Sequence, residues 1–190
     1  MYLSRPNHVV IAGLRDPTSP SSKALNDLPH GKSSKVILVK IDSAVETDAL
    51  TAIHTLNSEH SISKLDVVIA NAGISSYFGK ATVTPAEEML SHFKINTVAP
   101  LLLFQATFPL LNAAPMPKFV VITSGAGSIS NMGSLPVENT AYGSSKAAAN
   151  FVTRKIHFEN PNLIAFPVQP GWLQTDVSFP PFHLRVRGKV

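Results

Sequence analysis

Short runs rich in valine, isoleucine and alanine recur along the chain and alternate with longer stretches of helical character. Each run is nearly continuous in apolar residues, which is what a parallel strand covered on both faces requires. Five such runs are found: His8–Gly13, Lys35–Ile41, Leu65–Ala70, Lys118–Ser124 and Leu163–Val168. This alternation predicts a layered α/β structure built on a parallel sheet.

The stretches between the runs contain helix signals. Glu46 to His60 is expected to form one helix, and Ala141 to Phe158 another. Thr84-Pro85-Ala86-Glu87 has the pattern of a capping box with proline at the first helical position. Val98 to Leu111 is too short to cross a bilayer and is expected to be a buried helix. In the last run, Pro167 predicts that strand pairing ends early. Strand, crossover helix and strand at this spacing predict a doubly wound, Rossmann-type sheet.

Composition narrows the class of protein further. With 190 residues, 44% of them hydrophobic and 15% charged, the chain can build one core, and we expect a single domain over residues 1–176. Lysine and arginine are scattered, so nucleic acid is an unexpected partner despite the formal charge of +4. The absence of cysteine and of a secretory signal at Met1–Pro6 favours a cytoplasmic protein without a membrane anchor. The seven histidines lack metal-ligand spacing, so no metal is expected.

Polar residues and glycines follow each apolar run. In a parallel sheet these positions meet at the carboxyl edge, where ligands bind. They are Arg15-Asp16, Asp42, Asn71-Ala72-Gly73, Ser124 to Gly127 and Gln169 to Thr175. A Tyr-x-x-x-Lys pair, Tyr142 and Lys146, stands near the start of the last predicted helix.

The spacing of Tyr142 and Lys146 brings both side chains to one helix face. An ordinary tyrosine has a pKa near 10, so reaching about 7 requires ~4 kcal/mol of preference for the tyrosinate. A lysine ammonium about 4 Å away supplies about that much at an effective dielectric near 20. We therefore interpret the pair as a general acid and base that works near neutral pH.

Taken together, Asn71-Ala-Gly73, Ser124, the Tyr142/Lys146 pair and Pro170-Gly-x-Leu-x-Thr175 occur in an order that resembles the short-chain dehydrogenase/reductase superfamily, from about Val9 to Asp176. Asn139 to Ala148, Arg154 to Glu159 and Ile122 to Ile129 are most similar to fungal ketoreductases of the norsolorinic acid ketoreductase type, which act in secondary metabolism. The resemblance implies an NAD(P)-dependent oxidoreductase that acts on a small carbonyl or alcohol substrate.

The resemblance also assigns roles. Tyr142 would protonate the substrate oxygen, Lys146 would hold the nicotinamide ribose, Ser124 would polarise the carbonyl, and Asn96 would anchor a water relay. Ser124 lies 18 residues before Tyr142, more than is usual in the family, so Ser128 and Ser130 remain alternatives. We favour Ser124 because it ends a strand, and we expect the extra residues from Asn131 to Pro136 to form a loop.

For the cofactor, Arg15 is placed where a guanidinium could bind a 2′-phosphate, which favours NADPH over NADH, although Asp16 is adjacent. The resemblance implies further cofactor contacts. Asp42 would contact the adenine, Leu173 and Thr175 the carboxamide, and Asn71, Gly73 and Lys94 would line the cofactor site.

The glycine-rich turn that would bind the pyrophosphate is missing from the sequence, together with the strand that should precede it. That strand would lie between the first and third runs, so either these two pair directly or backbone groups remain unpaired at about 1–3 kcal/mol each. Val177 to Val190 also departs from the family and is expected to be a disordered tail.

Two functions follow. The first is NADPH-dependent reduction of a ketone, such as an aromatic polyketide, to a secondary alcohol. The second is an inactive, truncated chain that serves as an interaction partner of a full-length relative. The resemblance implies that the two long helices pack between subunits, so self-association is also expected. A regulatory dinucleotide sensor is disfavoured, because it would need the missing turn most.

Overall fold

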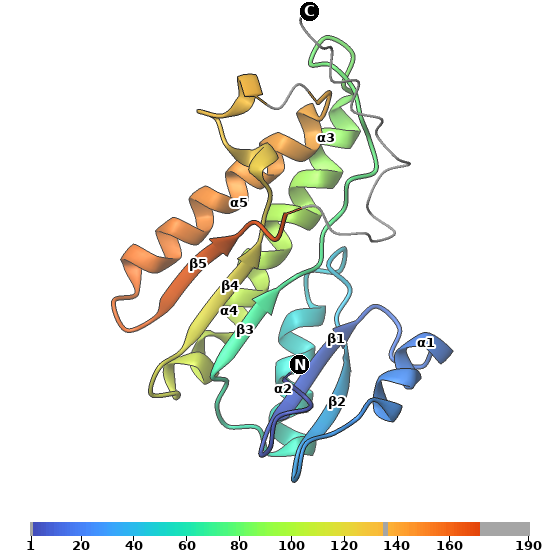
Figure 1. Cartoon of the computed structure of the whole chain (residues 1–190), viewed down its shortest axis with the longest axis vertical. Coiled ribbons are helices and arrows are strands. Elements are labelled where there is room, and N and C mark those ends of the chain that lie inside the picture. Colours follow the sequence, from blue (N-terminus) through green and yellow to red (C-terminus); the bar gives the residue numbers. More distant parts are fainter. Residues whose placement is uncertain (1, 135–136, 172–190) are drawn as a thin grey trace, which may run out of the picture.

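The computed structural model describes residues 2–134 and 137–171. Within these residues, helices and strands alternate along the chain (Figure 1). The strands are β1 (Val9–Leu14), β2 (Lys35–Lys40), β3 (Val67–Ala70), β4 (Lys118–Ile122) and β5 (Ile164–Val168). The helices are α1 (Pro20–Lys23), α2 (Asp48–His60), α3 (Ala86–Phe93), α4 (Ala99–Asn112) and α5 (Thr140–Glu159). Short 3-10 turns are η1 (Ala24–Asp27), η3 (Gly125–Gly127) and η4 (Met132–Ser134), and η2 (Lys94–Val98) is a π-helical turn that joins α3 to α4.

The strands form two parallel sheets. β1 pairs with β2, from Val9 opposite Lys35 to Leu14 opposite Lys40. β4 is the central strand of the second sheet, with β3 on one side and β5 on the other. In the part of the chain that the structure describes, β1 and β3 do not pair with each other. The predicted Rossmann-type α/β fold with an incomplete sheet is therefore observed, and the interruption lies between the first and third strands.

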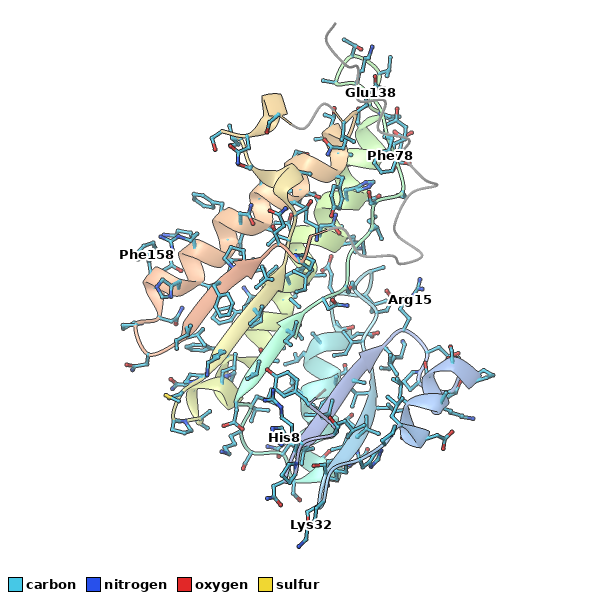
Figure 2. All side chains as sticks on the ribbon, in the orientation of Figure 1. His8, Arg15, Lys32, Phe78, Glu138 and Phe158 are labelled. Atoms are coloured by element: carbon cyan, nitrogen blue, oxygen red, sulfur yellow. The ribbon has the colours of Figure 1, made fainter. Side chains whose placement is uncertain are left out.

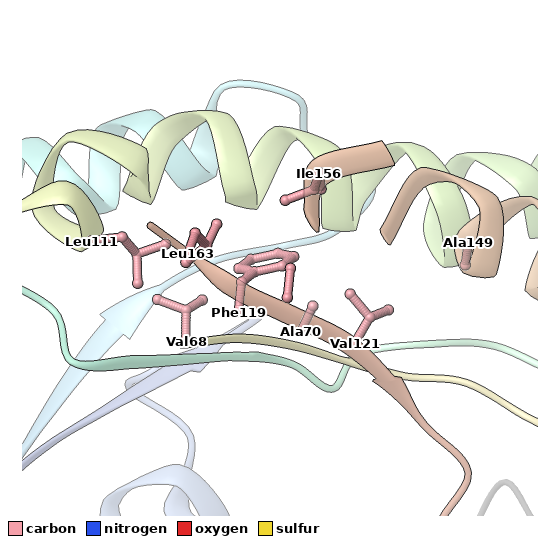
Figure 3. Close-up of a cluster of buried hydrophobic side chains, with 9 residues drawn as sticks. Val68, Ala70, Leu111, Phe119, Val121, Ala149, Ile156 and Leu163 are labelled. Carbon is pink, nitrogen blue, oxygen red and sulfur yellow. The ribbon is translucent and has the colours of Figure 1, made fainter. Parts of the chain in front are cut away.

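Helices α4 and α5 pack on one face of the three-stranded sheet. Phe119 is fully buried at the centre of a cluster that β3, β4, β5, α4 and α5 build together (Figure 3). Its ring meets that of Phe104 edge-on with 5.3 Å between centroids, an arrangement worth about 0.5–1.5 kcal/mol beyond burial. On the opposite face, Ile69, Ile164 and Phe166 are 44%, 45% and 39% exposed. Cover on both faces, which the sequence predicts, is not seen for these strands within the described residues.

A second cluster stabilises the two-stranded sheet. Ile37 and Val39 of β2 pack against Ala52 and Leu56 of α2. α2 also contacts α4, and α4 in turn contacts β3 and β4, so these helices join the two sheets. By length and composition alone the continuous helix 86–112 could cross a membrane. Its contacts with α2, β3 and β4, and the burial of Leu110 and Leu111, identify α4 as the buried core helix that the sequence predicts.

Two local predictions are wrong. Helix α3 begins at Ala86 with Pro85 as N-cap, and no side chain caps it. The predicted capping box fails because the Thr84 hydroxyl instead donates to the carbonyl of Lys80 at 2.8 Å. Strand pairing also continues past Pro167, since Thr123 N–H donates to the Val168 carbonyl at 2.8 Å. Ile164 and Val168 hydrogen-bond toward β4, and backbone groups alternate in direction along a strand. The backbone nitrogen of Pro167 therefore faces away from β4, so the N–H that proline lacks is not needed for this pairing.

Candidate active site

The predicted catalytic serine and the Tyr142/Lys146 helix meet at the carboxyl end of β4. Ser124 follows β4 in extended conformation and caps the turn η3, where its Oγ accepts from Ala126 N–H at 3.2 Å. Helix α5 begins two residues before Tyr142 and packs directly against η3. The Ser124 side chain is close enough to Tyr142 to act as a donor that lowers the pKa of the phenol. Ser128 and Ser130, by contrast, lie near each other at 3.3 Å on an exposed turn.

Two glycines allow this close approach of turn and helix. A Cβ atom on Gly127 would lie 2.7 Å from the Ala147 nitrogen, within the helix backbone. A Cβ on Gly143 would lie 2.9 Å from the Ala126 carbonyl oxygen. Both distances are shorter than real Cβ contacts, so only glycine fits at these positions. The sequence placed Gly127 in the turn after Ser124 but gave no role to Gly143, which lies between Tyr142 and Lys146.

Lys146 is a buried ammonium group in this site. The residue is only 4% exposed, and its Nζ donates to the Ile122 carbonyl at 2.9 Å. Burial lowers the pKa of Lys146 to about 8. Its Nζ lies 5.7 Å from the centroid of the Tyr142 ring. The lysine is therefore held by the end of β4 beside the tyrosine ring.

Burial raises the pKa of Tyr142, and the hydrogen bond with Ser124 opposes this rise only in part. The sequence argument predicted the opposite direction, from attraction between tyrosinate and ammonium. The difference has a physical reason: Lys146 turns its Nζ toward the Ile122 carbonyl, and loss of water around the phenol outweighs the remaining attraction. Tyr142 is therefore a protonated phenol at neutral pH in this structure.

Asn96 ties three segments together beneath the site. It lies in the π-helical turn η2 and is 1% exposed. Its Nδ2 donates to the Ile74 carbonyl and to Ser145 Oγ, both at 2.9 Å, and its Oδ1 accepts from Ile74 N–H at 2.8 Å. The amide thus links the loop after β3 to helix α5. π-helical turns are frequent at functional sites, and this one aims Asn96 at Ser145.

His92, one turn before Asn96, is a further residue that sequence reasoning missed. It is fully buried, and its Nε2 accepts from Ser76 N–H at 3.2 Å. Because Nε2 accepts, the proton is on Nδ1, which donates to the Glu88 carbonyl at 2.7 Å. His92 and Asn96 together fix residues 74–76. Their spacing of four on one helix is the sequence signal that could have paired them.

The loop after β3 contributes the predicted residues Asn71 and Gly73. A Cβ on Gly73 would lie 3.1 Å from Asn96 Oδ1 and 3.3 Å from Lys146 Nζ, so the glycine backbone lies against both groups. Asn71 is exposed at the end of β3. Lys94 is also exposed, and since it is two residues from Asn96 in a helical turn it does not face the same side. Leu173, Thr175 and the predicted tail lie outside the described residues.

Arg15 and Asp42 follow the two strands of the other sheet. Arg15 is exposed and projects away from the carboxyl end of β1 (Figure 2). The neighbouring Asp16 is engaged elsewhere, because its Oδ1 accepts from Thr18 N–H at 2.8 Å and from the Thr18 hydroxyl at 2.6 Å. These hydrogen bonds lower the pKa of Asp16. Asp42 Oδ1 accepts from Ala44 N–H at 2.8 Å, at the equivalent end of β2.

The described residues fit the nicotinamide ribose of a dinucleotide better than its pyrophosphate. A buried ammonium beside the bare backbone of Gly73 suits the hydroxyls of a nicotinamide ribose. In contrast, no glycine-rich turn leads from a strand into an α-helix within residues 2–134 and 137–171. The pyrophosphate therefore lacks the usual set of backbone donors in the described part of the chain.

Comparison with known proteins decides the family. The model of the short chain dehydrogenase family matches residues 2–180. The chain belongs to the short-chain dehydrogenase family. Members of this family are NAD(P)-dependent oxidoreductases that act on small carbonyl or alcohol compounds, as the sequence predicts.

Similar relatives are fungal ketoreductases. The chain is 45% identical over 180 residues to a norsolorinic acid ketoreductase of Emericella nidulans, covering 93% of this chain and 67% of the relative. It is 43% identical over 179 residues to the norsolorinic acid ketoreductase of Aspergillus parasiticus, covering 93% and 66%. The predicted resemblance is confirmed. This short-chain dehydrogenase thus spans about two thirds of the length of these relatives.

Solved structures agree with the fold. The NADPH-bound carbonyl reductase from chicken fatty liver is 26% identical and superimposes with a TM-score of 0.79, covering 88% of this chain and 67% of that chain. The carbonyl reductase Sniffer of D. melanogaster, at 23% identity and a TM-score of 0.70, shares the fold over 90% of this chain.

Proposed function

We propose that this short-chain dehydrogenase is an NADPH-dependent ketoreductase with Tyr142 as proton donor. The observation that carries the proposal is the packing of the turn that follows Ser124 against helix α5, where Lys146 is buried with its Nζ 5.7 Å from the centroid of the Tyr142 ring. A phenol whose pKa is raised by burial is protonated at neutral pH, which is the form that reduction of a ketone consumes. Tyr142 is therefore in the form that can act as the proton donor of a reduction.

In the proposed reaction the ketone oxygen lies between Ser124 and Tyr142. Ser124 Oγ accepts from Ala126 N–H, and its hydroxyl proton, which is directed at Tyr142 in this structure, would turn to the ketone oxygen when the substrate binds. Tyr142 gives its proton to that oxygen as the carbonyl carbon becomes tetrahedral. NADPH, when bound, would supply the hydride to this carbon, so the product would be a secondary alcohol. Lys146 then stabilises the tyrosinate, while Asn96 holds Ser145 and the Ile74 loop in place.

NADPH is proposed over NADH because the carboxylate next to Arg15, that of Asp16, is engaged by Thr18. The backbone N–H and the hydroxyl of Thr18 both donate to the Asp16 carboxylate, which leaves the Arg15 guanidinium free to bind a 2′-phosphate. By similarity to the relatives, Asp42, Asn71, Gly73, Lys94, Leu173 and Thr175 are proposed as further cofactor contacts.

The substrate class is proposed from the relatives. Two of them, at 45% and 43% identity, are norsolorinic acid ketoreductases, so an aromatic polyketide ketone is the first substrate to test. A cytoplasmic location and self-association through α3, α4 and α5 stay predictions.

The test begins with binding and proceeds to turnover. Purified chain is titrated with NADPH while nicotinamide fluorescence is followed, and NADPH consumption is then measured with norsolorinic acid. We expect binding in the micromolar range and slow turnover that Tyr142→Phe abolishes without loss of binding. Tyr2→Phe, at an exposed tyrosine, is the matched control and leaves turnover unchanged. If NADPH fails to bind even at millimolar concentration, the ketoreductase proposal is wrong for this chain.

One observation favours a second candidate function, that of a non-catalytic partner. The described residues lack the glycine-rich turn that usually binds the pyrophosphate. If the chain binds no cofactor but remains folded, this alternative replaces the first.

A further inference from the structure

Asn150 extends the face of helix α5 that carries the proposed catalytic pair. Tyr142, Lys146 and Asn150 are spaced by four residues, so their side chains project from one side of the helix. Helix α5 packs along β5 and against the turn η3 that follows β4 (Figure 1). Asn150 is half-buried. This row of side chains therefore meets the segment that carries Ser124.

The Asn150 side chain is bound to the residue that precedes Ser124. Thr123 is 6% exposed, and its Oγ1 donates to Asn150 Oδ1 at 2.8 Å. The same Oγ1 accepts from the Ser124 N–H, and the Thr123 N–H donates to the Val168 carbonyl of β5 at 2.8 Å. Threonine is β-branched, so its side chain has few allowed rotamers. One hydroxyl therefore joins the backbone of Ser124 to the helix that carries Tyr142.

The position of Ser124 relative to Tyr142 matters because both hydroxyls must reach one ketone oxygen in the proposed reaction. A displacement of about 1 Å in a catalytic group can cost ~100-fold in rate. Strand pairing does not fix Ser124, since β4 ends at Ile122 and Ser124 begins the turn η3. The bond between Thr123 and Asn150 supplies a constraint at this point, directly beside the serine.

We propose that Asn150 and Thr123 are positioning residues that hold the Ser124 hydroxyl against the Tyr142 phenol. Neither residue touches the reacting atoms; both act through the backbone of Ser124. The inference rests on the proposed function for its chemical meaning. The hold on Ser124 can nevertheless be measured without cofactor or substrate.

Ionisation of Tyr142 reports the position of Ser124. The chain has three tyrosines, so Tyr142 alone remains in a Tyr2→Phe/Tyr77→Phe background. Its titration is followed by the ultraviolet absorbance of tyrosinate, with circular dichroism at each pH to verify the fold. The pKa of Lys146 is about 8, so this lysine is neutral where the phenol titrates. Ser124→Ala supplies the reference, because loss of the serine donor should raise the pKa of Tyr142 further.

We expect Asn150→Leu to raise the pKa of Tyr142 as Ser124→Ala does. Both changes remove one contact, so the double variant should shift the pKa no more than the larger single change. Thr153→Val is the matched control: it removes another buried hydroxyl of α5, which donates to the Ala149 carbonyl at 2.7 Å, and should leave the pKa unchanged. An unchanged pKa in Asn150→Leu, additive shifts in the double variant, or an equal shift in Thr153→Val would overturn the proposal.

Thr123 supplies a second pair of variants, which decides the matter if Asn150→Leu does not fold. Thr123→Val keeps the shape of the side chain and removes the hydroxyl, whereas Thr123→Ser keeps the hydroxyl. We expect the first to raise the pKa of Tyr142 and the second to leave it at the wild-type value. Equal pKa values in these two variants would refute a role for the hydroxyl.

Kinetics separate failure of this inference from failure of the proposed function. With a ketone that the chain reduces, Asn150→Leu should lower kcat by ~10-fold or more and leave KM and NADPH binding within about twofold. A raised KM with unchanged kcat would place Asn150 at the substrate and contradict a positioning role. If the wild-type chain binds no NADPH, the proposed function is wrong, and the tyrosine titration still decides whether Asn150 holds Ser124.

Discussion

Lys146→Met is expected to stabilise the folded chain at neutral pH while removing the proposed ammonium. The residue is 4% exposed, and within the described residues its Nζ donates a hydrogen bond to the Ile122 carbonyl at 2.9 Å and has no carboxylate partner. Burying a charge without a counter-ion is unfavourable. Methionine fills a similar volume and carries no charge, so the variant separates the cost of the ammonium from its proposed role.

The magnitude follows from the pKa of Lys146. Burial lowers it from the ordinary 10.5 to about 8, which corresponds to about 3 kcal/mol. Between these values the unfolded chain binds more protons than the folded chain, so stability rises with pH in this window. Below pH 8 the full cost is present, and near pH 10.5 it is gone. The lost bond to Ile122 offsets about 1 kcal/mol, so we expect a net gain of about 2 kcal/mol at pH 7.

Urea unfolding followed by circular dichroism at a series of pH values measures this difference. The advantage of Lys146→Met should shrink steadily between pH 8 and pH 10.5. Lys155→Met is the matched control, because this lysine is exposed and pairs with Glu159 at the surface; its effect should stay below ~1 kcal/mol at every pH. A constant difference between Lys146→Met and wild type across this range would refute the reasoning.

Three further changes test the core, the loop and the cofactor. Phe119→Ala removes a fully buried ring and should cost about 3–5 kcal/mol in urea unfolding, against less than ~1 kcal/mol for the exposed Phe158→Ala; similar losses would contradict the core assignment. Asn96→Ala leaves the part-buried backbone N–H and carbonyl of Ile74 without their amide partner, which should cost about 1–3 kcal/mol and speed exchange of the Ile74 amide, and unchanged exchange would argue against this anchor. Arg15→Glu should reduce the preference for NADPH over NADH by ~10-fold or more in binding titrations, whereas an unchanged ratio would remove Arg15 from the cofactor site.

Local features of the fold were readable from the sequence because they depend on local composition. The run Lys118–Ser124 predicts β4, which spans Lys118–Ile122, and Ala141–Phe158 predicts α5, which spans Thr140–Glu159. Continuous β-branched residues favour a buried strand, and alanine-rich segments favour a helix, whatever surrounds them. The meeting of Ser124 with the Tyr142 helix also follows, because parallel strands end at one edge.

Features that depend on residues distant in the sequence could not be predicted from the sequence. Pro167 predicts the end of a strand, yet it is tolerated because, among the strands of the described residues, β5 pairs with β4 alone and Pro167 faces the other side. The pKa of Tyr142 depends on how deeply η3 and α5 bury the phenol and on where Lys146 points, neither of which the spacing of the two residues reveals. The buried role of His92 requires the loop around Ser76 to fold back over α3.

The π-helical turn η2 changes the direction in which side chains project along the continuous helix formed by α3, η2 and α4. Each residue of an α-helix is rotated by about 100° from the one before it, so the wider turn resets the direction in which α4 presents its side chains relative to α3. As a result α3 faces α5, whereas α4 faces α2 and the sheet. Chain length in this segment is therefore constrained: deleting a single residue between His92 and Ala99 would rotate Leu110 and Leu111 out of the core. Insertions and deletions should be tolerated instead in the exposed turn η4.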